Sequence, residues 1–194
     1  MAKRVFFSFH YQDVIDFRAN VFRNHWLMKP DRKSAGFFDA SVWEFAKKTG
    51  PVAIKRLINA AVNNTSVTCV LIGSQTYARP WVRYELLKSF RQGNKLLAVH
   101  INSIKGRDQK TKSKGYNPLS YVGVSYSDSG LTATLHEKVN GKWQPYTEID
   151  GSASYHTGGV PEEYRGNGYN LGRWYSIYAW VSDDGYRSFA GWVA

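Results

Sequence analysis

Glu85, Trp81 and Tyr84 are the residues whose types and spacing most suggest chemistry. Pro80 suits the first turn of a helix, and the segment predicts a helix that ends near residues 93–94. Trp81 and Glu85 are four residues apart, so they share one face of that helix, with Tyr84 beside them. A carboxylate flanked by two aromatic rings can stabilise a positive charge on a bound ligand. The alternative is that Trp81 packs in the core and Glu85 is a solvated surface charge.

The element before this helix decides where the three side chains lie. Residues 67–72, Val-Thr-Cys-Val-Leu-Ile, form a continuous apolar run rich in β-branched residues, which is typical of a strand buried on both faces. Gly73 and Ser74 end the run. Glu85 is therefore expected just past the carboxyl end of a central strand, where open α/β sheets bind their ligands.

The first hundred residues alternate between short apolar strands and amphipathic helices. Strands are expected at 5–9, 35–39, 67–72 and 96–101, and helices at 13–27, 51–62 and 80–93, with a polar loop at 31–34 and a connection at 40–49 that holds a helical turn. Asp13 is expected as the N-cap of the first helix. This alternation predicts a parallel sheet with helices on both faces. No dinucleotide-binding glycine motif or phosphate-binding loop is present, so the predicted sheet is flavodoxin-like.

The last third of the chain has a different pattern. A fifth strand is expected at 121–126, and Asn140-Gly141 predicts a hairpin between strands at 132–139 and 142–146. A long loop at 150–172 precedes a second expected hairpin, which turns at Asp184-Gly185 between strands at 174–181 and 186–193. The expected organisation is an α/β core over residues 1–125 and a β-hairpin extension over 126–194 that packs on this core, so that both form one structural domain.

Length and composition exclude several classes of protein for this chain. With 194 residues, 43% hydrophobic and 15% aromatic, the chain can bury a good core and is not disordered. No apolar run approaches the length of a membrane span, and the N-terminus leads directly into a strand, so we expect a cytoplasmic protein without membrane contact. Cys69 is the single cysteine and excludes an internal disulfide. The five histidines are scattered without ligand spacing, so no metal is expected.

A net charge of +11 suits an anionic ligand. Residues 105–115 carry several of the cations among small polar residues and are expected to form a mobile basic loop. This loop is interpreted as solvated, with contact to an anion or a nucleic acid as the alternative.

Three motifs in order resemble a TIR domain. Residues 8–13, Ser-Phe-His-Tyr-Gln-Asp, resemble the first TIR box, and residues 36–39, Gly-Phe-Phe-Asp, resemble the second strand leading into the BB loop. Ser74, Tyr77, Trp81 and Glu85 match the third box. The similarity covers residues 3–125 and is greatest to the TIR-like proteins of bacterial Thoeris anti-phage systems. Two departures are visible: hairpins are expected in place of the final TIR helix, and His10-Tyr11 stands where many members carry arginine.

The resemblance implies an enzyme that cleaves NAD, with Glu85 as its catalytic residue. Cleavage of the nicotinamide–ribose bond leaves an oxocarbenium-like cation that a carboxylate can stabilise. The implied product is a cyclic ADP-ribose isomer, made on phage infection, that activates a separate NAD-depleting effector. NAD is then the substrate, and the site can be completed by head-to-tail self-association.

Further substrate contacts are assigned by the same resemblance. Trp81 and Tyr84 are expected to stack on a ring or exclude water. Phe6, Phe9 and Tyr77 are expected in the pocket wall, and Ser8, His10 and Ser74 near phosphate or ribose. Tyr11 is included as a contact, and Asp39 is expected to orient the nicotinamide. Core packing or loop capping is the alternative for each.

Two other functions stay open from the sequence. The chain can be a non-catalytic TIR module that acts by self-association, in which case Glu85→Gln would signal like the wild type. It can also be a nucleic-acid-binding protein, which the charge suggests and which we favour least. That function predicts binding whose affinity falls steeply with salt.

Overall fold

The computed structural model describes residues 3–28, 32–35 and 40–194, with side chains described over 4–28 and 45–194. A sheet of five parallel strands forms its centre, in the order β10-β4-β3-β1-β2. The strands are β1 (Lys3–Ser8), β2 (Arg32–Ala35), β3 (Val67–Ile72), β4 (Lys95–His100) and β10 (Ile177–Ala179). This order is the flavodoxin-like one, and the expected α/β fold with a parallel central sheet is confirmed.

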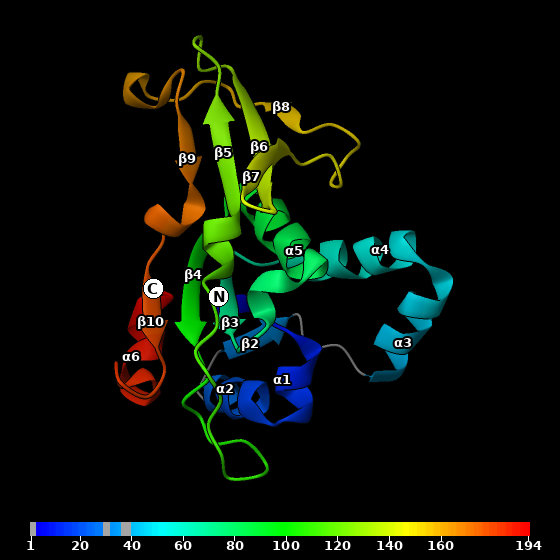
Figure 1. The fold of residues 1–194 in the computed structure, drawn as a ribbon, viewed down its shortest axis with the longest axis vertical. Helices are drawn as coiled ribbons and strands as arrows, with labels where there is room; N and C mark the ends of the chain where they lie inside the picture. The colour runs from blue at the N-terminus through cyan, green and yellow to red at the C-terminus, as the bar shows by residue number, and fades with distance from the viewer. Residues whose placement is uncertain (1–2, 29–31, 36–39) are drawn as a thin grey trace.

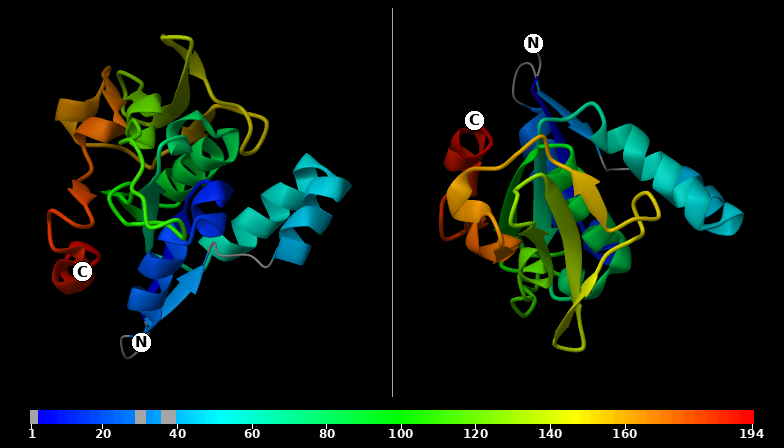
Figure 2. Two further views of the ribbon diagram at one scale, coloured as in Figure 1. Left: turned by 60° about the horizontal axis from the view of Figure 1, so that its bottom comes forward. Right: turned by 90° about the horizontal axis from the view of Figure 1, so that it is seen from above.

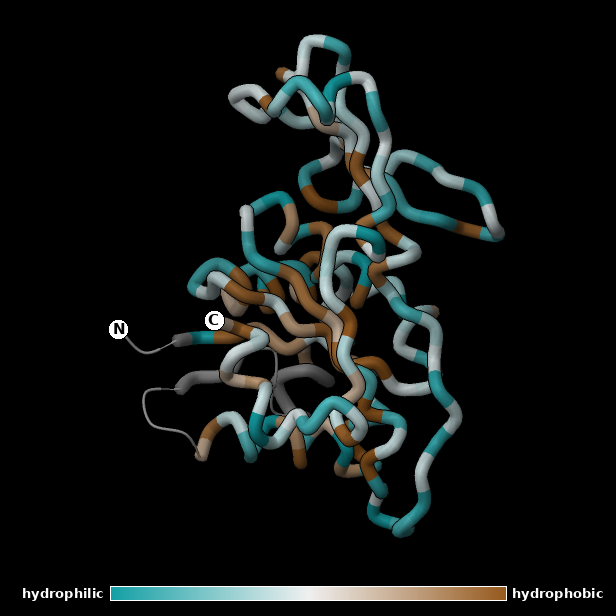
Figure 3. The backbone as a smooth tube through the Cα atoms, turned by 90° about the vertical axis from the view of Figure 1, so that its left-hand side faces the viewer, coloured by the Kyte–Doolittle hydropathy of each residue, from teal (hydrophilic) through white to brown (hydrophobic). Residues whose placement is uncertain are grey.

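Helices cover both faces of this sheet (Figure 1). They are α1 (Tyr11–Ile15), α2 (Arg18–Leu27), α3 (Ala40–Thr49), α4 (Pro51–Val62), α5 (Pro80–Arg91) and α6 (Gly185–Trp192). Side chains alternate along each strand, so Val5 and Phe7 of β1 pack with α2 and α6, whereas Phe6 packs with α4 and α5. Hydrophobic residues concentrate on the central strands (Figure 3), and α3 and α4 project to one side (Figure 2).

A second, antiparallel sheet stands at the upper end of Figure 1. Its strands are β5 (Val122–Tyr126), β6 (Thr132–Val139), β7 (Lys142–Pro145), β8 (Ser154–His156) and β9 (Gly168–Asn170), in the order β7-β6-β5-β9 with β8 also paired to β6. Asn140 and Gly141 have positive φ angles of 49° and 81°, which confirms the predicted hairpin. The fifth strand is confirmed, but it belongs to this sheet and not to the central one.

Short 3₁₀ turns connect several of these elements. They are η1 (Thr76–Ala78), η2 (Pro118–Tyr121), η3 (Glu162–Tyr164) and η4 (Leu171–Arg173). The predicted loop over 150–172 therefore contains β8, β9, the whole of η3 and part of η4. One face of the second sheet packs on α5 through Val122, Val124 and Leu135, which joins both sheets in one hydrophobic cluster.

The predicted hairpin at residues 174–193 is wrong. β10 pairs in parallel with β4 and becomes an edge of the central sheet, and the following segment forms α6. Gly185, Phe189 and Val193 are buried at four-residue spacing, which is the stripe of a helix. A final helix is therefore present where hairpins were expected to replace it. The division of the chain into domains at residue 125 stays a prediction.

The expected first helix at 13–27 is interrupted. It forms as α1 and α2, separated at Phe17, whose φ of 67° lies in the left-handed region. Asp13 is not an N-cap, because His10 precedes α1 and Asp13 lies buried within it. This break lets Asp13 and Arg18 both turn inward.

Residues 32–49 also differ from expectation. The polar loop expected at 31–34 is strand β2 from residue 32 onward, because its backbone pairs with β1 at the sheet edge. The strand expected at 35–39 lies, beyond Ala35, outside the described residues, as does Asp39. The connection at 40–49 is a full helix of ten residues rather than one turn.

Candidate active site

The candidate site lies at the carboxyl ends of β1 and β3. Helices α1 and α2 leave β1 on one face of the sheet and α5 leaves β3 on the other, so the chain changes direction between these two strands. Such a switch point opens a crevice at the end of the strands. Ser8 ends β1 on the face covered by α5, and Glu85 lies in the second turn of α5.

Ser8 and Glu85 are joined by a buried hydrogen bond. Ser8 Oγ donates to Glu85 Oε2 at 2.5 Å, across 77 residues of sequence. Ser8 is fully buried and Glu85 is 7% exposed, so the alternative of a solvated helix charge is wrong. Both residues are predicted from the sequence, but their contact is not.

Burial changes the acidity of the Glu85 carboxyl. Loss of water raises the pKa of Glu85 to about 8, and the hydrogen bond from Ser8 acts in the opposite direction. The carboxyl is therefore mostly protonated at neutral pH while no cation is near. A positive charge placed beside it would favour ionisation and gain a strong attraction in this dry environment.

The aromatic residues on α5 have different surroundings. Trp81 is half-buried and meets Tyr84 edge-on, with ring centroids 6.0 Å apart. Tyr84 is buried, and its hydroxyl donates to Asn59 Oδ1 on α4 at 3.0 Å. The Tyr84 ring is thus held toward α4, which leaves Trp81 as the ring of the pair that a ligand can reach.

The expected pocket-wall residues do not all lie together. Phe6 is fully buried in the cluster beneath α5. Phe9 packs against the cluster on the opposite face of the sheet. Tyr77 lies on η1 with its ring 5.1 Å from Tyr116 and 5.4 Å from Tyr121. Their roles as substrate contacts stay predictions.

Two cations and one carboxylate, that of Asp16, lie near His10. His10 is half-buried, and its pKa is lowered first by burial and then by the nearby charges of Arg79 and Lys112. Arg79 precedes α5, and its buried Nε has no hydrogen-bond partner among the described residues. Ser74 and Tyr11 are half-buried at the ends of the same two strands.

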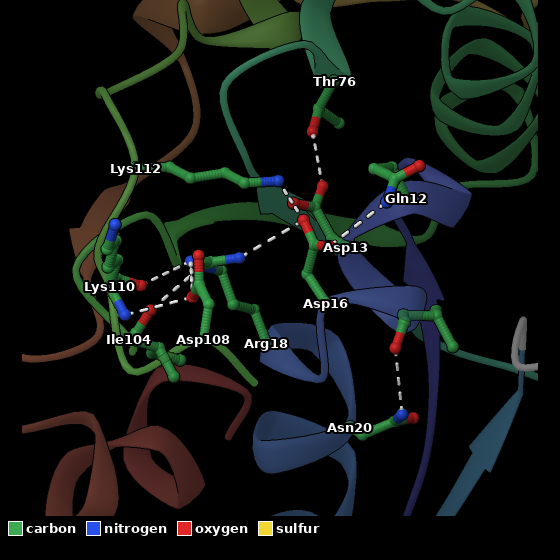
Figure 4. Close-up of polar contacts among 11 residues, drawn as sticks. Gln12, Asp13, Asp16, Arg18, Asn20, Thr76, Ile104, Asp108, Lys110 and Lys112 are labelled. Carbon is green, nitrogen blue, oxygen red and sulfur yellow. Dashed lines mark hydrogen bonds and ion pairs between the residues drawn. The ribbon is translucent and has the colours of Figure 1, made fainter. Parts of the chain in front are cut away.

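Asp13 is a buried acid that sequence analysis misassigned. It is 3% exposed, and burial raises its pKa to about 6. Its Oδ2 lies 3.5 Å from Thr76 Oγ1, so it joins the β1 and β3 ends of the site (Figure 4). The capping preference of aspartate gave no sign of this role. The residue in the sequence that could have indicated it is Gly73, because the absence of a side chain there makes room for the Asp13 carboxylate.

Gly73→Ala tests this close approach. A Cβ at residue 73 would lie 2.3 Å from both Asp13 carboxylate oxygens, so the variant should lose about 1–3 kcal/mol of unfolding free energy in a denaturant titration. Gly191→Ala is the matched control, because nothing lies within 4 Å of its Cβ position and alanine favours a helix. Equal stabilities of the two variants would contradict this role for Gly73.

Arg18 was not singled out by sequence analysis, yet it organises the basic loop. It is 1% exposed, and its guanidinium donates to the carbonyls of Ile104 at 3.0 Å and Lys110 at 2.6 Å (Figure 4). It also lies 3.3 Å from Asp16, which pairs with Lys112. Residues 105–115, expected as a mobile loop, are therefore tied to α1 and α2.

The described residues contain neither a cluster of metal-binding side chains nor a membrane-spanning helix. Within residues 3–28, 32–35 and 40–194, no group of three or more histidine, cysteine, aspartate or glutamate side chains could hold a metal ion. No helix in the described part of the chain is both long and apolar enough to cross a membrane.

The flavodoxin-like strand order, with a buried glutamate facing the switch point, is the arrangement expected of a TIR-type fold. The family model for the TIR-like domain of Thoeris protein ThsB matches residues 6–105. A Bacillus cereus (strain MSX-D12) protein whose name describes it as a cyclic ADP-D-ribose synthase, ThsB1, is 56% identical over 194 residues, which is 100% of both chains. This chain belongs to the TIR-like family of Thoeris ThsB proteins.

Proposed function

We propose that the protein cleaves NAD at the nicotinamide–ribose bond and joins the ribose to another part of the same molecule, giving a cyclic ADP-ribose isomer. The observation that carries this is the desolvated Glu85 carboxyl held by Ser8 at the switch point. Full-length similarity to a protein named as a cyclic ADP-D-ribose synthase supports the same reaction.

The proposed mechanism starts with ionisation of Glu85. The positively charged nicotinamide ring of NAD lowers the pKa of the nearby carboxyl, which releases its proton. As the C–N bond breaks, nicotinamide leaves as a neutral molecule with the bonding pair, and the positive charge moves to the ribose. The Glu85 carboxylate, poorly solvated and fixed by Ser8, stabilises that cation.

Ring closure completes the reaction. A nucleophilic oxygen or nitrogen of the same ADP-ribose attacks the ribose C1″ and loses its proton. The balance is NAD⁺ to cyclic product, nicotinamide and H⁺. Trp81 shields the ribose cation from water. The nucleophile on the same molecule can then react with the cation faster than water does. Arg79 and Lys112 near His10 provide the positive charge that the pyrophosphate needs.

The cellular part of the proposal follows from the family. Phage infection switches the enzyme on in the cytoplasm, and the diffusible product activates a separate effector that depletes NAD. Head-to-tail contact between copies completes the site. The test is mass spectrometry of NAD, nicotinamide and ADP-ribose isomers in infected and uninfected cells. Protection from phage without any such product would favour the non-catalytic TIR scaffold instead.

Ser8→Ala is expected to move the pH dependence of the reaction. Because the Ser8 hydrogen bond lowers the pKa of Glu85, its loss raises that pKa further and leaves less carboxylate at a given pH. The rate at neutral pH should fall about tenfold or more, and the rising limb of kcat/KM against pH should shift to higher pH. Nicotinamide release from pH 5.5 to 9.5 measures both. An unmoved limb would show that the proton of Glu85 does not control the rate.

A further inference from the structure

A groove of about 640 Å³ crosses the outer face of the second sheet. Gly123, Val124 and Ser125 of β5 line it, although the side chains of Val122 and Val124 pack in the core on the other face of the sheet. Its remaining lining comes from β6, β7, β9 and the turn after β9, so Glu85 takes no part in it. Its volume is typical of a small-molecule site.

The groove is basic, and two exposed indoles line it, Trp143 and Trp174. Lys138 and Arg173 line it, no acidic residue does, and neither cation has a carboxylate partner among the described residues. Trp143 is 44% exposed, and Lys138 Nζ lies 5.9 Å from its ring centroid. On the floor, Ser125 Oγ and His136 Nε2 are 2.8 Å apart, which gives a polar anchor between the strands.

The Trp143 ring lies over the groove because β5 has no side chain beneath it. A Cβ at Gly123 would lie 3.2 Å from the ring and 2.7 Å from the Tyr169 carbonyl oxygen. Glycine therefore lets the indole lie across the strand. A flat aromatic surface beside unpaired cations matches a ligand that carries both an aromatic ring and an anion.

We propose that this groove binds a nucleotide, with its base against Trp143 and its phosphate held by Lys138 and Arg173. The two cations, neither of which has a carboxylate partner among the described residues, attract the phosphate, and the indole stacks on the base. The volume suits one such molecule rather than a protein segment.

The strand that carries the groove is also tied to α5. Glu137 lies between His136 and Lys138 on β6 and points to the opposite face, where its Oε2 is 2.9 Å from Arg83 Nη1. Both side chains are less than one-fifth exposed. Arg83 precedes Glu85 by two residues. A ligand bound on β6 can therefore change the position of α5, the helix that carries the Glu85 carboxyl, and so the rate of NAD cleavage. This regulatory part rests on the proposed function.

Nuclear magnetic resonance of the indole N–H groups tests the site directly. The chain has seven tryptophans, and Trp143→Phe and Trp81→Phe identify the two signals needed. Titration with AMP should move the Trp143 signal. The double variant Lys138→Glu, Arg173→Glu should weaken this binding at least tenfold. The double variant Lys142→Glu, Arg187→Glu makes the same change of charge at two exposed positions outside the groove lining, so it is the charge-matched control and should bind AMP like the wild type.

The outcomes separate this site from the active site. If AMP shifts the indole N–H signal of Trp81 and not that of Trp143, the groove proposal is overturned and the proposed function is left intact. Tighter binding of a hexaglutamate peptide than of AMP at Trp143 would overturn it in favour of an acidic protein partner. If AMP shifts the Trp143 signal but the protein never cleaves NAD, the nucleotide site is supported and the regulatory part is refuted. Dispersed spectra of the double variant establish that it is folded.

Discussion

Glu85→Gln is expected to reduce nicotinamide release from NAD by a factor of about a hundred or more. Glutamine keeps the size of the side chain and can still accept the hydrogen bond from Ser8, so the geometry of the site is preserved. What it loses is the negative charge that stabilises the ribose cation. Mass spectrometry of the purified protein, or of infected cells where activation is required, follows nicotinamide and the cyclic product together.

The stability of the same variant supplies its control. The pKa of Glu85 is raised to about 8 in the folded protein from an ordinary value of 4.5, so the folded state binds more protons between these pH values. Stability contributed by the protonated carboxyl is then present below pH 4.5 and lost as the pH rises toward 8. Glu85→Gln escapes this loss, and its Tm should exceed that of the wild type at pH 8 by more than at pH 5.

The two readouts distinguish the possible outcomes. An inactive variant with the raised Tm at pH 8 has lost charge and not structure, which places Glu85 in the chemistry. Full cyclic product from Glu85→Gln would refute the proposed mechanism. Equal Tm differences at pH 5 and pH 8 would show that the carboxyl is not desolvated in solution.

Local signals in the sequence predicted the central part of the site well. The buried run at 67–72 matches β3 residue for residue, and Pro80 begins α5 as expected. The strand pattern and the helix start each depend only on residues that are neighbours in the sequence. The contact of Ser8 with Glu85 could not be derived in this way, because it depends on the pairing of β1 with β3, more than fifty residues apart.

The C-terminal segment shows how a local signal can mislead. Asp184-Gly185 is a strong hairpin signal, and Asp184 does adopt the left-handed conformation, with φ of 49°. The turn leads into a helix because Gly185 packs against the Trp180 ring, where a Cβ would lie 2.2 Å from the nearest ring atom. Phe189 and Val193 of the expected strand instead form a buried helical stripe with Gly185, whereas Tyr186 is exposed. Tertiary packing therefore overrode the β-propensity of this segment.

Arg18→Met is expected to destabilise the fold by about 3 kcal/mol or more. Methionine fills similar space but removes the Arg18 donor of the Ile104 carbonyl and one of two donors to the Lys110 carbonyl, which keeps the Gly106 N–H. It also removes a buried cation beside Asp16. The loop at 105–115 should then detach from α1 and α2. Thermal unfolding gives the loss of stability, and amide hydrogen exchange shows whether the loss is local, with faster exchange at Gly106 and Lys112.

Arg187→Met is the matched control for this substitution. Arg187 is 90% exposed, and its pair with Asp184 spans 3.8 Å at the surface, so its loss should leave Tm unchanged. Lys112 comes from the same loop and lies near His10, so detachment also removes a cation from the proposed pyrophosphate side. Arg18→Met should therefore raise the KM for NAD at a temperature where the protein is still folded. A stable variant with normal exchange in the loop would contradict the role of Arg18, whose guanidinium donates to both loop carbonyls.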